Sequence, residues 1–283
     1  MGRYLERHPG MRGAAALLRR YFDHHVARDS AALTYYLLFA LFPLLIFLNN
    51  LVGVFAIDLT ELLEEVSAVI PRDVVTLAEQ YLAYVSRSSS TTMMWFSLVF
   101  TFYFPYRAVN ALFLSVRKAY DVPPPTGFVR GQLRAVLYTI LLVITLVITP
   151  VVSAVGRRSL EFLAQYVYLS EYAIRRWTQL RFVFLGAVLF FMIVLLYALA
   201  LDAHSIRRGI LPGVLAALAA WITLSMLFSL YVEHAANYSL IYGSIGAIIV
   251  LLLWLYLSAT MLIMGAEFNS VLLTIRESEA KNA

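Results

Sequence analysis

The chain has 283 residues, of which 61% are hydrophobic and only 14% are charged. A soluble domain carries about 25% charged residues, so this composition excludes an ordinary soluble protein and indicates one surrounded by a lipid bilayer. The chain has no cysteine, which excludes disulfides, thiolate catalysis and cysteine-bound metal. We attribute the net charge of +5 to basic loops that face anionic membrane lipids, and we expect no nucleic-acid partner.

The predicted fold is all-α, a polytopic membrane helix bundle of six transmembrane helices with amphipathic outer connecting helices. Residues 1–28 form a basic, amphipathic N-terminal segment, residues 29–275 the transmembrane domain and residues 276–283 a tail. Each predicted span is an apolar run long enough to cross a bilayer, which takes about 20 residues. The spans are predicted at residues 31–56, 93–116, 132–155, 182–201, 210–231 and 240–264, the last helix continuing to residue 275.

The distribution of basic residues predicts the orientation. Of the 22 lysines and arginines, 14 flank the spans on the side of the two termini and seven on the opposite side. Since cytoplasmic loops carry the excess of Lys and Arg, both termini are predicted to be cytoplasmic.

Two predicted outer connections are longer than a turn requires. Residues 59–84 carry apolar side chains at helical spacing on both sides of Pro71, and residues 160–177 combine apolar side chains with arginines. Such amphipathic segments lie in the membrane interface or cap the bundle.

Two charged residues lie at membrane depth in the predicted helices. Arg107 follows Pro105 in the second span, and Glu267 lies in the continuation of the last helix, at a similar distance from the cytoplasmic edge. Charged groups at membrane depth cost about 2.5–3.5 kcal/mol on insertion scales, so both must find partners. We predict an Arg107–Glu267 ion pair, which is either purely structural or part of a cationic site for a phosphate or carboxylate headgroup.

Other polar and small residues of the spans are weaker candidates. The asparagines at the outer end of the first span could simply face the interface, and the outer tyrosines could form an ordinary aromatic belt. The glycines permit close helix contact, which leaves a homo-oligomer open, and the prolines could act as hinges. The additional pathway candidates are Asn110, Asn269, Tyr35, Asn49, Asn50, Tyr238 and Tyr242, and the hinge or packing candidates are Pro43, Pro105, Gly243, Gly246 and Gly265.

Enzyme chemistry has little support in the sequence. The five histidines show no HxH or HExxH spacing, and there is no phosphate-binding loop, nucleophile elbow or dinucleotide-binding glycine pattern. We therefore predict no catalytic residue, no metal and no cofactor.

Three segments resemble the YihY/BrkB family of bacterial inner-membrane proteins. They are ARDSAALTYYLLFALFPLLIFL, LPGVLAALAAWI and YSLIYGSIGAIIVLLLWLYLSATMLIMGAEFNSVL. The resemblance implies a multi-pass protein of the cytoplasmic membrane, with transport of a lipid or envelope precursor as the leading suggestion. Family members have been labelled ribonuclease BN. This sequence argues against that activity, because metal-dependent nucleases need clustered His and Asp ligands.

Two functional hypotheses follow. The first is a transporter or translocase of an anionic lipid or lipid-linked precursor, with Arg107 attracting the headgroup. The second is a non-transporting envelope scaffold that binds partner proteins. The transporter predicts a polar cavity that reaches Arg107, whereas the scaffold predicts close packing there and a fully paired Arg107.

Overall fold

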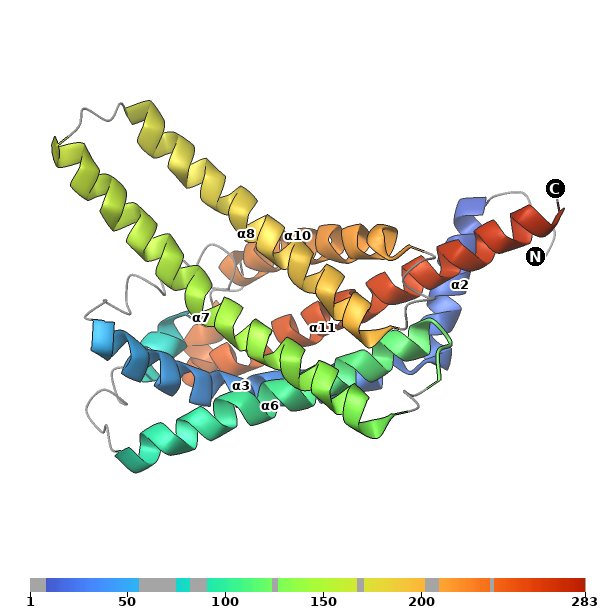
Figure 1. Cartoon of the computed structure of the whole chain (residues 1–283), viewed down its shortest axis with the longest axis horizontal. Helices are drawn as coiled ribbons and strands as arrows, with labels where there is room; N and C mark the ends of the chain where they lie inside the picture. The colour runs from blue at the N-terminus through green and yellow to red at the C-terminus, as the bar shows by residue number, and fades with distance from the viewer. Residues whose placement is uncertain are drawn as a thin grey trace.

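Long helices make up most of the part of the chain that the structure, a computed structural model, describes (Figure 1). The described residues are 9–55, 75–81, 91–123, 127–166, 171–201, 209–234 and 237–282. The all-α prediction is confirmed for these residues, which contain helices and turns and no strand. The helices are α2 (Pro9–Asp23), α3 (Val26–Phe55), α6 (Thr91–Ala119), α7 (Phe128–Tyr166), α8 (Glu171–Ala200), α10 (Leu211–His234) and α11 (Asn237–Asn282).

Five of these helices are long and apolar enough to cross a membrane. The stretches are Val26–Phe47 of α3, Val129–Leu146 of α7, Val183–Ala200 of α8, Leu211–Tyr231 of α10 and Ile245–Ser278 of α11. Helix α6 has 29 residues, a sufficient length, but it is not among the five. Its hydropathy is lowered by tyrosines and by polar residues that include Arg107 and Asn110.

The helices run alternately up and down the bundle. Helix α3 packs along α6 and α10 packs along α11, and α11 also contacts α3 and α6. Helix α7 packs on α6, and α8 packs on α6, α7 and α10. Helix α11 therefore joins the two antiparallel pairs, and both chain termini lie near its C-terminal end (Figure 1).

The second outer connection differs from the prediction. Helix α7 has 39 residues and continues to Tyr166, and α8 begins at Glu171, so residues 160–177 belong largely to the ends of two long helices. No Pro or Gly interrupts the sequence between residues 157 and 181, and the helices can therefore extend. Of the first connection, only residues 75–81 are described. They are helical, with Val75 and Ala78 buried.

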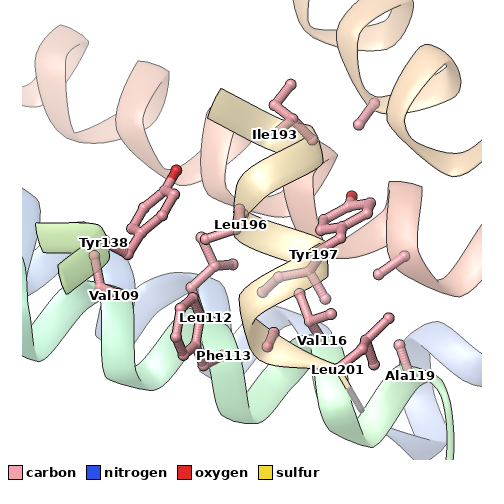
Figure 2. Close-up of a cluster of buried hydrophobic side chains, with 14 of the residues drawn as sticks. Val109, Leu112, Phe113, Val116, Ala119, Tyr138, Ile193, Leu196, Tyr197 and Leu201 are labelled. Atoms are coloured by element: carbon pink, nitrogen blue, oxygen red, sulfur yellow. The ribbon is translucent and has the colours of Figure 1, made fainter. Parts of the chain in front are cut away.

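The main core lies between α6, α7, α8 and α11 (Figure 2). Leu112 and Val116 of α6 are buried against Leu196 and Tyr197 of α8. The hydroxyl group of Tyr197, which is completely buried, donates a hydrogen bond of 2.6 Å to the carbonyl of Leu262 on α11. Because the lipid gives helices little hydrophobic reason to associate, such packing and interhelical hydrogen bonds hold a membrane bundle together.

Candidate functional site

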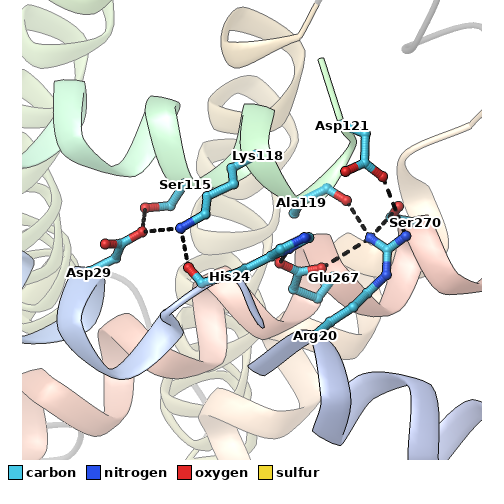
Figure 3. A network of polar contacts seen from close by, with 9 residues as sticks. All are labelled: Arg20, His24, Asp29, Ser115, Lys118, Ala119, Asp121, Glu267 and Ser270. Atoms are coloured by element: carbon cyan, nitrogen blue, oxygen red, sulfur yellow. Dashed lines mark hydrogen bonds and ion pairs between the residues drawn. The ribbon is translucent and has the colours of Figure 1, made fainter. Parts of the chain in front are cut away.

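A cluster of charged side chains lies where α2, the start of α3, the end of α6 and α11 meet (Figure 3). We call the cluster of Arg20, His24, Asp29, Lys118 and Glu267 the polar junction. It lies at the end of the bundle that holds both termini.

Glu267 is the centre of the polar junction. Its side chain has no exposed surface, and its Oε2 atom lies 3.2 Å from Nη1 of Arg20. Its Oε1 atom lies 2.5 Å from Nδ1 of His24. Because a buried carboxylate is strongly unfavourable without partners, these two contacts from α2 and the turn after it offset the cost of burial.

Arg20 links three helices through its guanidinium group. Besides Glu267, Nη1 donates to the carbonyl of Ala119 at 2.7 Å and to Oγ of Ser270 at 3.0 Å. Its Nη2 lies 3.5 Å from the exposed carboxylate of Asp121. Ala119 is the last residue of α6, and a cation there is favoured by the negative end of the helix dipole.

Lys118 connects the same end of α6 to the start of α3. Its ammonium group donates to the backbone carbonyl of His24 and lies 3.4 Å from Oδ2 of Asp29. Ser115, one turn earlier on α6, donates to the same carboxylate oxygen at 3.4 Å. The short link between α2 and α3 is thus fixed by side chains of α6.

Asn269, one of the pathway candidates, is buried two residues beyond Glu267. Its Nδ2 donates to the hydroxyl of Tyr120 and to the carbonyl of Gly209, both at 2.7 Å, and its Oδ1 accepts from the amide of Gly213 at 3.0 Å. Burial raises the pKa of Tyr120 to about 12. The Asn269 amide thus joins α11 to the start of α10 and to the turn after α6.

Helices α10 and α11 cross closely at two glycines. A Cβ atom on Gly265 would lie 2.5 Å from Cβ of Ala217 and 2.9 Å from the carbonyl oxygen of Gly213. A Cβ atom on Gly213 would lie 2.6 Å from Cβ of Asn269. Only glycine permits this approach, so Gly265 has a packing role in the structure.

Arg107 lies apart from the polar junction, and the predicted Arg107–Glu267 ion pair is wrong. The Arg107 side chain is exposed, and its Nη2 donates to the hydroxyl of Tyr36 on α3 at 3.1 Å. Its guanidinium carbon lies 5.4 Å from the centre of the Tyr36 ring. The neighbouring residues Ala108 and Val109 occupy the core-facing side of α6, which leaves Arg107 on the outer side. Helix α2 supplies the cation for Glu267 through Arg20.

The other predicted residues are dispersed over the bundle. Tyr35 is exposed on α3, with its ring 4.7 Å from that of Phe39, and Asn110 is half-buried on α6. Pro43, Pro105 and Gly246 are buried inside helices that continue past them. The remaining candidates lie within α3 or α11, but their side chains are outside the described residues: Asn49, Asn50, Tyr238, Tyr242 and Gly243.

Four of the five residues of the polar junction were not predicted as site residues from the sequence: Arg20, His24, Asp29 and Lys118. Arg20 and His24 are four residues apart, so they lie on one face of a helical segment, and that spacing was the available signal. Among the described residues, no group of three or more His, Asp and Glu side chains could hold a metal ion.

These features define a polytopic helical membrane protein with a buried, charged cluster at one end of its bundle. The family model described as Virulence factor BrkB matches residues 17–283, and the chain therefore belongs to the BrkB family, as its sequence predicts.

Relatives are similar to different extents. The putative ribonuclease-like protein YfkH of Bacillus subtilis is 31% identical over 256 residues, which cover 90% of this chain and 93% of that protein. The UPF0761 membrane protein PSHAa0171 of Pseudoalteromonas translucida is 31% identical over 77 residues, covering 27% of this chain and 26% of its own length. The UPF0761 membrane protein XCC0860 of Xanthomonas campestris is 36% identical over 91 residues, which cover 32% of this chain and 21% of that protein. No solved structure matches the chain.

Proposed function

We propose that the protein is a transporter that moves an anionic lipid, or a lipid-linked envelope precursor, across the bacterial cytoplasmic membrane. The observation that carries this proposal is the exposed Arg107 on the outer side of α6. At 1.5 Å per residue, Arg107 lies roughly 24 Å from Thr91 and roughly 18 Å from Ala119, near the middle of a membrane-length helix. A guanidinium group exposed at that depth needs an anionic or aqueous partner.

The surroundings of Arg107 suit a phosphate headgroup. Tyr36 binds one guanidinium nitrogen and presents its ring to the cation, and neither contact neutralises the charge. The remaining N–H groups can bind two oxygens of a phosphate in parallel, a geometry that a lysine cannot reproduce. Exposed aromatic side chains of α3 and α6, such as Tyr35 and Tyr103, offer apolar contact to the acyl chains.

We include α6 as a sixth span in this proposal. Six spans place the N- and C-termini on the same side of the membrane, which we assign to the cytoplasm. The 29-residue length of α6 and its packing between α3, α7 and α8 support its assignment as a span. The excess of Lys and Arg on the side of the termini supports the orientation. The polar junction then closes the cytoplasmic end of the bundle.

The scaffold hypothesis remains the alternative, and Glu267 favours it. Its carboxylate is packed without exposed surface and both oxygens have partners, as expected for a closed bundle.

We further propose that the chain is not a ribonuclease, although the name of its relative YfkH includes that activity. Purified protein should leave RNA intact with and without added Mn²⁺ or Zn²⁺. Metal-dependent cleavage that a point mutation abolishes would overturn this view.

A reconstitution experiment tests the transport proposal. Protein in phosphatidylcholine liposomes should move fluorescent phosphatidylglycerol between leaflets faster than protein-free liposomes, as followed by dithionite quenching. Arg107→Ala should slow the movement at least tenfold, and Arg107→Lys should fall between the two. Arg130→Ala, at an exposed arginine near the start of α7, is the control for loss of one positive charge and should match the parent.

Two outcomes would contradict the proposal in different ways. Equal rates in parent and protein-free liposomes would favour the scaffold. Transport that Arg107→Ala leaves unchanged would establish a translocase but remove Arg107 from its pathway.

A further inference from the structure

Helix α2 has one side against the bundle and crosses its end at a steep angle to α11 (Figure 1). Arg20 and His24 on this side contact Glu267, and the hydroxyl of Tyr21 lies 3.5 Å from that of Tyr256 on α11. These contacts fix the rotation of α2 about its own axis. They therefore determine which of its residues face away from the protein.

The side of α2 that faces away is divided into an apolar and a polar stripe. Leu18 and Phe22, one turn apart, are 62% and 64% exposed. The adjacent stripe carries Arg19 and Asp23, which form an exposed ion pair with a distance of 3.2 Å. A helix with a bundle-facing side, an apolar flank and a charged flank is suited to lie in the plane of a membrane surface.

A shallow hollow of about 390 Å³ adjoins the apolar stripe at the turn between α2 and α3. Tyr21, Phe22, His25, Ala27 and Arg28 line it. The Arg28 side chain is 70% exposed and contacts the neighbouring Asp29 with Nε and Nη2. His25 is exposed as well and has a left-handed backbone conformation with φ of 53°. Among the residues that line the hollow, Tyr21 and Phe22 are aromatic, and His25 and Arg28 carry basic side chains.

We propose that α2 docks on the adjacent membrane leaflet and that this hollow binds the headgroup of an anionic phospholipid. Leu18 and Phe22 insert at the border between headgroups and acyl chains, while Arg19 and Asp23 stay in water. Arg28 and His25 contact the lipid phosphate. This inference concerns binding alone and does not depend on the transport proposal.

The position of α2 argues for a lipid surface rather than a protein partner. Only the two residues His24 and His25 separate α2 from α3, whose membrane-spanning stretch begins at Val26. The apolar stripe is therefore close to the level at which the bilayer begins. An arginine beside exposed apolar side chains complements an anionic leaflet, which attracts basic residues near its surface.

Site-directed spin labelling tests the docking directly, because the natural chain has no cysteine. Single cysteines replace Leu18, Phe22 or, as the water-facing control, Arg19, and each carries a nitroxide in liposomes of phosphatidylcholine and phosphatidylglycerol. The labels at positions 18 and 22 should be accessible to oxygen and shielded from a water-soluble nickel chelate, at a depth of roughly 5–10 Å. The label at position 19 should show the reverse.

Two results would overturn the docking. If the nickel chelate reaches positions 18 and 22 as readily as position 19, the stripe faces water. If both reagents are excluded at positions 18 and 22, protein covers the stripe.

Lipid composition tests the headgroup site. The label at position 18 leaves the lining of the hollow unchanged and should move deeper when phosphatidylglycerol is added to pure phosphatidylcholine. Arg28→Gln combined with His25→Gln should abolish this shift, whereas Arg130→Gln, at an exposed arginine that does not line the hollow, should leave it intact. An equal depth in both lipids, or a shift that persists in the double variant, would refute the headgroup site. A melting temperature equal to that of the parent establishes that the double variant is folded.

Discussion

Nδ1 of His24 lies 2.5 Å from Oε1 of Glu267, which joins the turn after α2 to the middle of the C-terminal half of α11. This contact and the 3.2 Å contact between Arg20 and Glu267 attach the N-terminal segment to the helix bundle. The segment does more than supply positive charge at the membrane surface. It provides the groups that allow a carboxylate to be completely buried.

Removal of either partner of the Arg20–Glu267 pair should destabilise the protein. Replacing one member of a buried ion pair leaves the other charge unpaired, at a cost of about 3–5 kcal/mol. We expect Glu267→Ala and Arg20→Ala each to lower the free energy of unfolding by an amount of that order. The measurement is reversible unfolding of the protein in mixed detergent micelles.

Asp121→Asn is the matched control for this pair. Asp121 lies 3.5 Å from Arg20, but its side chain is 70% exposed, and exposed ion pairs contribute about 0–1 kcal/mol. The variant should therefore unfold close to the parent. A similar loss in all three variants would mean that burial of Glu267 is not what makes its pairing important.

A second prediction concerns the crossing of α10 and α11. In Gly265→Ala, the new Cβ would lie 2.5 Å from Cβ of Ala217, so the helices must separate. Overpacking of this kind costs about 1–3 kcal/mol, and the melting temperature should fall. Gly186→Ala on α8 is the control, since its Cβ would meet no atom within 4 Å and alanine favours the helix. If Gly186→Ala lowers the melting temperature as much as Gly265→Ala, steric contact is not the cause.

The sequence predicts the helices well because each apolar run has the length that a bilayer requires. The predicted span 132–155 lies inside α7 and the span 210–231 nearly coincides with α10. The partners of Glu267 could not be predicted in the same way. The position of a residue in the sequence gives its depth in the membrane but not the side of the helix on which it lies. The predicted pairing with Arg107 is wrong because Arg107 lies on the outer side of α6. The rotation of each helix depends on packing between segments far apart in the sequence.

A third prediction concerns Arg117, whose side chain is 5% exposed at the end of α6. Its Nη1 donates to the carbonyl of Ala200 at 2.8 Å and its Nε to the carbonyl of Pro123 at 3.0 Å. Ala200 is the last residue of α8, so Arg117 satisfies a carbonyl that the helix itself leaves free. Arg117→Lys keeps the charge but loses the planar group that reaches both carbonyls.

Arg117→Lys should therefore lower the free energy of unfolding by about 1–3 kcal/mol, the cost of leaving a buried acceptor unsatisfied. Arg130→Lys, at an exposed position of α7, should have no measurable effect. Equal stability of the two variants would show that a single ammonium group can replace both contacts.

The last prediction concerns pH and Tyr120, whose pKa burial raises from 10.0 to about 12. Below pH 10, the phenol is neutral in both the folded and unfolded chains and does not affect the pH dependence of stability. Between pH 10 and 12, the unfolded chain loses this proton while the folded chain retains it, so stability falls as the pH rises. The loss approaches about 1.4 kcal/mol per pH unit, which is the free energy of one pKa unit.

Tyr120→Phe should remove this alkaline loss. At neutral pH the variant should be less stable than the parent by about 1 kcal/mol, because the hydrogen bond from Asn269 is lost. This difference should shrink, and then reverse, as the pH rises from 10 towards 12. Unfolding of both proteins across this pH range measures the change, with Tyr35→Phe at an exposed tyrosine as the control. If the difference between parent and Tyr120→Phe stays constant with pH, the buried hydroxyl of Tyr120 does not resist ionisation in the folded protein.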